Sequence, residues 1–248
     1  MQLNDMATRL DGSFKALSAE RDALRNFVAD ASHELRTPIT ALKAYNELMQ
    51  TSARADAGAQ AEFLANSQQQ IERLEWITRN LLDLSRLDAG IAVLDVRDHD
   101  PVSVLRSAAA PFALVAQQRG VTLNLKFMEQ GFKVRADRTR LEMALGNLID
   151  NALKFTPAGG TVDAGVQPTD ATGRFVTFSV RDTGPGIAPE DLPRVFDRFY
   201  RSPTAQASGS GLGLALVKAI AEAHHGVARV SSVAGQGSEF VLELPAVT

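Results

Sequence analysis

The stretch FVADASHELRTP, residues 27–38, places a histidine on a helix, and the rest of the chain is organised around it. Through this stretch and upstream of it, apolar residues recur at alternating spacings of four and three, the heptad spacing of a helix packed along one seam. Arg21 interrupts the seam, which otherwise consists of Leu3, Ala7, Leu10, Phe14, Leu17, Leu24, Val28, Ala31 and Leu35. His33 is offset from Ala31 and Leu35 by two steps of about 100°, so it points roughly 200° away from the seam. We expect an exposed imidazole, although position alone does not separate a reactive histidine from an ordinary surface one.

A second helix is predicted to pair with the first. The first helix should bend at Pro38, because proline lacks a backbone donor and crowds the preceding turn. Residues 51–59 have few apolar anchors and predict the tip of a hairpin. The four-three spacing then returns over residues 61–87, at Leu64, Ile71, Leu74, Thr78 and Leu81. Two helices with such narrow seams bury too little alone, so we predict a homodimer in which two hairpins form a four-helix bundle.

Composition excludes several classes of protein. With 248 residues the chain is long enough for one or two domains, and its net charge of -3 gives no reason to expect nucleic acid as a partner. The absence of cysteine excludes disulfides, thiolate catalysis and cysteine-ligated metals. The longest apolar runs, such as residues 108–116, are too short to cross a bilayer, and no signal peptide opens the sequence. We therefore expect this chain by itself to be soluble. Because the heptad is already in phase at Leu3, we expect the helix to begin further upstream in the native protein.

A second domain of different periodicity is predicted after a polar linker at residues 95–100. An amphipathic helix is expected over residues 101–119, stopped by Gly120, followed by an alternating strand over residues 121–127. Asp137 can cap a further helix that ends near Phe155. Later segments predict strands at 161–166 and 174–180, a helix at 212–225 closed by Gly226, and a strand pair at 227–231 and 239–244 joined by the turn 235–237. The expected fold is an α+β sandwich, a sheet with helices on one face.

The helix after Asp137 carries a polar stripe. Asn147, Asn151 and Lys154 are spaced by four and three and fall within about 60° of one another around the helix axis. Amide oxygens suit a partly hydrated Mg²⁺, and a lysine suits phosphate oxygens. An ordinary solvated helix face is the alternative.

A second candidate site is the turn DTGPGI, residues 182–187, directly after a predicted strand. Here the Asp182 carboxylate could accept a hydrogen bond from the exocyclic amine that distinguishes adenine from guanine. Gly184 and Gly186 would let the backbone approach a flat ring. The alternative is a connecting turn in which Asp182 caps its own backbone.

A third candidate is the run SGSGLGL, residues 208–214, where Gly209, Gly211 and Gly213 lead into a helix. Backbone amides at a helix N-terminus bind phosphate without side-chain charge. The spacing is neither that of a dinucleotide-binding fingerprint nor that of a Walker A loop. Residues 202–207 are small and polar and suggest a lid over a nucleotide, and the aromatic cluster at 196–201 could anchor it, although Phe196 and Phe199 are better explained by core packing.

The remaining histidines do not suggest a metal site. His33 and Glu34 begin an HExxH pattern, but Thr37 occupies the position of its second histidine, which argues against a metalloprotease. His99, His224 and His225 fall in the predicted linker and at a helix end, where solvation or the helix dipole explains them.

Taken together, these stretches resemble the cytoplasmic core of a two-component sensor histidine kinase. Five segments match the family's boxes in order, which is more specific than any single motif. They are the H box at 27–38, the N box at 147–156, the G1 box at 182–187, the F box at 196–200 and the G2 box at 209–213. Residues 3–10 also resemble the end of a HAMP signalling module.

The resemblance implies a domain plan and a set of partners. The plan is a signalling helix at 1–25, a dimerisation and phosphotransfer domain at 26–94, a linker at 95–100 and a Bergerat-type ATP-binding domain at 101–248. The partners would be a second copy of the chain and a response-regulator receiver domain. Such a core would be the cytoplasmic portion of a protein anchored in the bacterial inner membrane through upstream segments.

The resemblance also implies residue roles. Asp182 would bind adenine, Asn151 would carry Mg²⁺, and Asn147, Lys154 and the amides of residues 209–213 would surround the phosphates of ATP. The acceptor would be His33, with Glu34 as the base and Thr37 positioning water for a phosphatase reaction. A straightening bend at Pro38 would relay a signal. Two alternatives remain: an inactive nucleotide-binding scaffold, and an ATPase or serine kinase on the same ATP fold.

Overall fold

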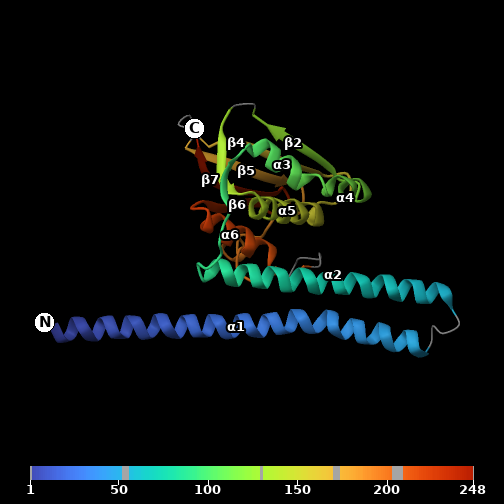
Figure 1. Cartoon of the computed structure of the whole chain (residues 1–248), viewed down its shortest axis with the longest axis horizontal. Helices are drawn as coiled ribbons and strands as arrows, with labels where there is room; N and C mark the ends of the chain where they lie inside the picture. The colour runs from blue at the N-terminus through green and yellow to red at the C-terminus, as the bar shows by residue number, and fades with distance from the viewer. Residues whose placement is uncertain (1, 52–55, 129–130, 170–173, 203–208, 248) are drawn as a thin grey trace. The chain divides into compact units, whose positions relative to one another are not determined.

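The computed structural model describes residues 2–51, 56–128, 131–169, 174–202 and 209–247 (Figure 1). The chain divides into two compact units, Met1–Arg79 and Asn80–Thr248. Among the helices described, none combines the length and the apolar character needed to cross a membrane.

The first unit is a helical hairpin built from α1 (Gln2–Thr51) and α2 (Ala57–Asp88), whose last turns belong to the second unit. This confirms the predicted pair of helices. The predicted tip includes residues 52–55, which lie outside the described residues, and Asp56 beside them caps α2 by accepting hydrogen bonds from the amides of Gly58 at 2.9 Å and Ala59 at 3.1 Å. Close to this end, the rings of Tyr45 and Phe63 stack 6.2 Å apart and join the two helices.

Pro38 lies inside α1 without ending it. The helix continues for more than three turns beyond the proline, and its axis changes direction toward its C-terminal end in Figure 1. Pro38 is buried, and the hydroxyls of Thr37 and Thr40 donate to the carbonyls one turn before them, at 3.3 Å and 2.9 Å. Side-chain hydroxyls that bond the preceding turn also favour a bend in a helix.

The second unit contains a mixed sheet in the order β1-β3-β7-β5-β4-β2, with β6 also paired to β7. Its strands are β1 (Val96–His99), β2 (Thr122–Phe127), β3 (Lys133–Asp137), β4 (Thr161–Pro168), β5 (Phe175–Asp182), β6 (Val227–Val233) and β7 (Gly237–Val247). All neighbours are antiparallel except β2 and β4. The helices that pack on the sheet are α3 (Pro101–Ala109), α4 (Phe112–Gln118), α5 (Arg138–Phe155) and α6 (Gly213–Ala223), with a short 3-10 helix, η1 (Leu192–Arg194).

The core lies between this sheet and the helices. Alternate residues of β4 are buried, namely Val162, Ala164 and Val166, and β7 contributes Phe240, Leu242 and Leu244 in the same way. From the helices come Leu141, Leu145, Leu148 and Leu216. A sheet with one buried face and helices against it is the α+β sandwich that the sequence predicted.

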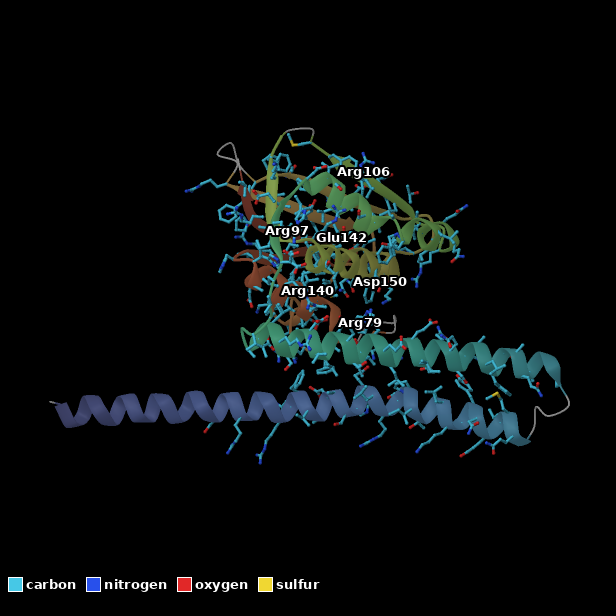
Figure 2. All side chains as sticks on the ribbon, in the orientation of Figure 1. Arg79, Arg97, Arg106, Arg140, Glu142 and Asp150 are labelled. Atoms are coloured by element: carbon cyan, nitrogen blue, oxygen red, sulfur yellow. The ribbon has the colours of Figure 1, made fainter. Side chains whose placement is uncertain are left out.

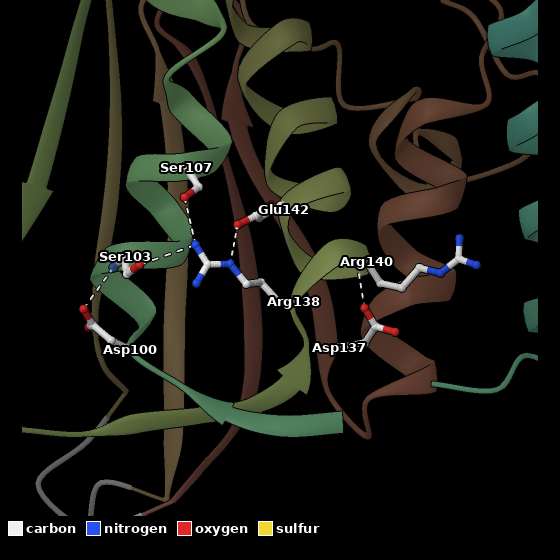
Figure 3. Close-up of polar contacts among 7 residues, drawn as sticks. All are labelled: Asp100, Ser103, Ser107, Asp137, Arg138, Arg140 and Glu142. Carbon is white, nitrogen blue, oxygen red and sulfur yellow. Dashed lines mark hydrogen bonds and ion pairs between the residues drawn. The ribbon is translucent and has the colours of Figure 1, made fainter. Parts of the chain in front are cut away.

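Polar contacts fix the N-terminal ends of α3 and α5 (Figure 3). Asp100 caps α3 by accepting from the amides of Val102 and Ser103, and Asp137 caps α5 by accepting from Arg140, as predicted for Asp137. Arg138 extends from α5 to the hydroxyl of Ser107 on α3 at 2.9 Å (Figure 3). These bonds hold α3 and α5 side by side.

Three sequence predictions about this unit were wrong. The polar segment 95–100 is not a free linker, because Val96–His99 forms β1 and pairs with β3, a strand that was not predicted. The single helix expected over 101–119 is two helices, because Pro111 at the start of α4 has no amide hydrogen to continue α3. The left-handed residue that ends α6 is His225, with φ of 58°, and not Gly226.

His224 is buried, and solvation does not explain it. Its Nδ1 lies 2.8 Å from the carbonyl oxygen of Ile220, and its Nε2 accepts a hydrogen bond from the amide of Asp137 at 2.9 Å. This pairing requires the proton on Nδ1. The end of α6 is thereby joined to the start of α5, the two helices of the candidate ATP site.

Candidate ATP and phosphoacceptor sites

The polar stripe predicted on α5 faces α6. Asn147 donates from Nδ2 to the carbonyl of Met143 at 2.9 Å, which leaves its amide oxygen toward α6. A Cβ atom on Gly213 would lie 2.9 Å from this oxygen, so glycine permits the close approach. The N box and the G2 box, far apart in the sequence, therefore meet at the first turn of α6.

The neighbouring members of the stripe, Asn151 and Lys154, are half-buried on the same helix. Lys154 forms an ion pair with Asp150, which is labelled on α5 in Figure 2. No motif of the sequence predicted a role for Asp150. The Lys154 ammonium, which was expected to contact phosphate, is paired with the Asp150 carboxylate. Phosphate oxygens would have to replace this carboxylate as the partner of Lys154.

Asp182 ends β5 and is buried. Its carboxylate accepts hydrogen bonds from the backbone amides of Gly184, at 2.8 Å, and of Ser238. Burial raises the pKa of the Asp182 carboxyl above its ordinary value, and these two hydrogen bonds oppose the rise. The contact with Gly184 is the local cap that was the alternative to adenine binding. Because a carboxylate has further acceptor positions, this cap does not exclude a bond to an amine.

The turn between β6 and β7 packs directly on the G1 box. Gly237 has φ of 89°, and a Cβ atom there would lie 2.0 Å from the carbonyl oxygen of Asp182. The amide of Gly235 donates to the carbonyl oxygen of Pro185 at 2.6 Å, and Gly186 of the same box has φ of 71°. The sequence predicted residues 235–237 only as a hairpin turn, because the contact of this turn with residues 182–187 depends on the pairing of β5 with β7.

The F box and the G2 box are joined through their backbones. Phe199 has φ of 59°, and its amide donates to the carbonyl of Gly211 at 2.9 Å. Gly211 has φ of 70°, and a Cβ atom on it would lie 2.5 Å from the carbonyl carbon of Phe199. The ring of Phe196 packs edge-on against Phe240, which agrees with a core role. Residues 203–208, which include most of the predicted lid and the first residue of the glycine run, lie outside the described residues. Gly209 follows directly after them.

The three predicted catalytic residues of the H box, His33, Glu34 and Thr37, lie on α1 in the first unit. His33 is exposed, as the heptad spacing predicted. Glu34 faces α2, and its carboxylate lies 3.3 Å from the guanidinium of Arg73, with side chains 16% and 34% exposed respectively. Thr37 donates its hydroxyl hydrogen to the carbonyl of His33 at 3.3 Å. Sequence reasoning missed Arg73, because no spacing within α2 indicates a partner on α1.

The described residues contain no group of three His, Cys, Asp or Glu side chains that could hold a metal ion. Asn151 offers one amide oxygen, which fits an ion that retains water and nucleotide phosphates as its other ligands. A Mg²⁺ ion here would therefore be bound jointly with the nucleotide and not by a protein cage.

Comparison with known proteins finds two domain families in the chain. The His Kinase A (phospho-acceptor) domain matches residues 23–90, and the histidine kinase-, DNA gyrase B- and HSP90-like ATPase domain matches residues 136–248. The sensor histidine kinase CusS of Escherichia coli (strain K12) is 34% identical over 249 residues, which cover 99% of this chain and 49% of CusS. The chain spans about half the length of the curated relatives it matches.

Two solved structures share the architecture. The Acinetobacter baumannii histidine kinase AdeS aligns with a TM-score of 0.70 at 28% identity, covering 86% of this chain and 97% of the AdeS chain. The histidine kinase ThkA, solved in complex with the response regulator protein TrrA, aligns with a TM-score of 0.71 at 23% identity, covering 89% of this chain and 61% of that one, and shows a likeness of fold. The two matched domains, in this order along one chain, place the protein in the sensor histidine kinase family, of whose cytoplasmic core it carries the phosphoacceptor and ATP-binding domains.

Proposed function

We propose that this chain is a kinase core that phosphorylates its own His33 from Mg-ATP and passes the phosphoryl group to an aspartate of a response regulator. The observation that carries the proposal is the meeting of the N, G1 and G2 boxes in one unit. Asn147 approaches Gly213, and a Cβ atom on Gly184 would lie 2.8 Å from the carbonyl oxygen of Phe155 in the N box. The other unit displays an exposed histidine beside a carboxylate.

The ATP site follows from these contacts. The Asp182 carboxylate accepts a hydrogen bond from the exocyclic amine of adenine, and Gly184 and Gly186 keep the backbone close to the ring. The backbone amides at the start of α6, from Gly209 to Gly213, face the phosphates, where the positive end of the helix dipole favours anions. Asn147 and Lys154 add one amide and one cation, and Asn151 supplies the oxygen for Mg²⁺.

The transfer step forms a bond between an imidazole nitrogen of His33 and the γ-phosphorus, and breaks the bond from that phosphorus to the bridging oxygen of ADP. Glu34 takes the proton that the imidazole loses, as a general base on the next residue. A bound Mg²⁺ ion would neutralise charge that develops on the phosphate oxygens. The phosphoryl group then passes to a receiver aspartate. Thr37 would position water for the phosphatase direction.

The hairpin supports a homodimer. Val28, Leu64, Ile71 and Trp76 are between 39% and 59% exposed although they lie on helices with apolar seams. Burying these side chains against a second hairpin removes apolar surface from water, which favours association.

Upstream segments, which relatives of twice this length have room for, would anchor the dimer in a membrane. The domain boundaries at 1–25, 26–94 and 101–248 stay part of this proposal, and the segment 95–100 between them includes the strand β1.

Intact mass spectrometry tests the function directly. The chain is incubated with Mg-ATP, and its mass is measured at neutral and at acid pH, alongside His33→Gln and Asn151→Ala. We expect one phosphoryl group that acid removes, because a phosphorus–nitrogen bond is acid-labile, and none in either variant. An acid-stable adduct, or one that survives the loss of His33, would indicate a serine kinase. ATP binding without any adduct on His33 would indicate the inactive scaffold.

A further inference from the structure

We propose that Ser232 is a positioning residue for nucleotide recognition, which holds the G1 turn, residues 182–187, against the β6–β7 hairpin. The inference rests on the proposed contact of Asp182 with adenine. It concerns the orientation of that carboxylate and not a contact of Ser232 with the nucleotide.

The Ser232 hydroxyl is the centre of a small network. Its oxygen accepts a hydrogen bond from the amide of Ile187 at 2.8 Å, and its hydrogen is donated to the carbonyl oxygen of Gly237 at 2.7 Å. The hydroxyl oxygen of Ser238 lies 3.0 Å away. Ser232 and Ser238 are direct neighbours across the β6–β7 pair.

The hydrogen-bond inventory of serine assigns the donors. A hydroxyl has one hydrogen and two acceptor lone pairs. Since Ser232 gives its hydrogen to Gly237, the contact with Ser238 requires the Ser238 hydroxyl to donate. Ser232 then uses its one donor and both acceptor positions within the protein, and it determines the direction in which the Ser238 hydroxyl points.

The network attaches both ends of the G1 turn to one hairpin. At the first end, the backbone amide of Ser238 donates to the Asp182 carboxylate. At the other end, the Ile187 amide donates to Ser232. Between them, the Gly235 amide donates to the carbonyl of Pro185. The Asp182 carboxylate is therefore held by a closed ring of bonds that passes through Ser232.

Loss of the hydroxyl opens this ring at two places. The Ile187 amide and the Gly237 carbonyl would both lose a partner, and an unpaired polar group in a protein interior is costly. The turn could regain those bonds only by moving, and the Asp182 carboxylate is anchored at its other end. Recognition of adenine should therefore weaken more than the chemistry at the phosphates, which depends on α5 and α6.

The test compares Ser232→Ala with Ser232→Thr and Ser231→Ala in the full chain. Threonine keeps the hydroxyl and suits a strand. Ser231 is the matched control, because it is exposed and lies on the opposite face of β6. Dissociation constants for ATP and GTP are measured by titration calorimetry, and KM and kcat are measured for phosphorylation of His33.

We expect Ser232→Ala to weaken ATP binding about tenfold. GTP binding should change much less, so the preference for ATP over GTP falls, and KM should rise more than kcat falls. Ser232→Thr should restore the preference, and Ser231→Ala should match the wild type. An unchanged ATP preference in Ser232→Ala, or equal weakening of ATP and GTP together with a lower melting temperature, would overturn the inference.

Asp182→Asn, measured in parallel, separates this inference from the proposed site. If Asp182→Asn abolishes the ATP preference and Ser232→Ala does not, the adenine site stands and the role of Ser232 is wrong. If Asp182→Asn binds ATP as the wild type does, the adenine contact itself is wrong, and the basis of the inference is lost with it.

Discussion

The Arg73 guanidinium on α2 lies 3.3 Å from the carboxylate of Glu34, the residue that follows His33 on α1. The pair orients the proposed base from the other helix of the hairpin. A partly exposed ion pair adds little stability, so we expect its effect to be on the reaction more than on folding.

The first prediction concerns this pair. Glu34→Gln should slow His33 phosphorylation about 10²-fold, because a general base contributes on that scale. Arg73→Ala should slow it by at most about tenfold, because the carboxylate remains and loses only its orientation. Rates are measured under single-turnover conditions with radiolabelled ATP. Arg79→Ala, which removes another exposed arginine of α2, is the control. If Arg73→Ala is faster than the wild type, the pair restrains the base and does not orient it.

The ion pair between Lys154 and Asp150 gives a second prediction, because the two members should act in opposite directions. Lys154→Gln should weaken ATP binding about tenfold, since a cation beside phosphate is lost. Asp150→Asn should not weaken ATP binding, because it frees the ammonium. The measurement is ATP affinity at low and high salt. Weakening by both substitutions would show that the pair is a structural element of α5.

A third prediction concerns pH. Burial raises the pKa of the Asp182 carboxyl above the usual 3.8, so in the folded protein this group keeps its proton to a higher pH than in the unfolded chain. Ionising this carboxyl group therefore costs more in the folded protein than in the unfolded chain. The free energy of unfolding should fall as the pH rises from the ordinary pKa of 3.8 through the raised pKa of Asp182. The adenine amine needs the ionised form, so ATP affinity should fall as pH drops below the raised pKa.

This pH effect is measured as the ratio of ATP to GTP affinity between pH 4 and pH 7. GTP carries the same phosphates and controls for their titration. A ratio that stays constant across this range would contradict a carboxylate contact with adenine.

The fourth prediction compares two glycines of the β6–β7 turn. Both have positive φ, but only Gly237 would place a Cβ atom against backbone, 2.0 Å from the Asp182 carbonyl oxygen. Gly235→Ala should cost about 1 kcal/mol for its backbone conformation. Gly237→Ala should cost more, because the turn must also separate from the G1 box, and it should weaken ATP binding. Thermal unfolding and ATP titration measure both effects. Equal losses in the two variants would show that the close approach is easily relieved.

The fifth prediction tests the dimer. Leu64 and Ile71 are 59% and 42% exposed in the single chain, and both lie on the predicted seam of α2. Ile71→Asp should weaken dimerisation by at least about 100-fold, because a carboxylate would be buried in an apolar interface. Gln69→Asp puts the same charge on the opposite side of the helix and should leave the dimer intact. Sedimentation equilibrium distinguishes dimer from monomer. Dissociation of both variants, or of neither, would contradict the predicted seam.

Sequence periodicity identified the elements that carry the site. The spacing of three and four residues placed His33 away from the α1 seam and grouped Asn147, Asn151 and Lys154 on α5, because neighbours on a helix surface are fixed by the helix itself. Asp137 was recognisable as a cap for the same reason. The linker prediction at residues 95–100 failed, because a short polar segment becomes a strand only when a partner such as β3 is available.

The stretch of residues 27–38 thus determined by itself that a histidine faces solvent on a helix, since that depends on neighbours a few residues away. Tertiary structure alone decided which groups hold the site: Arg73 on Glu34, Ser232 on Ile187, and the Ser238 amide on Asp182. These contacts join residues 39, 45 and 56 positions apart in the sequence. No local period encodes such pairs, because they form only when the helices of the hairpin pack and the strands of the sheet pair.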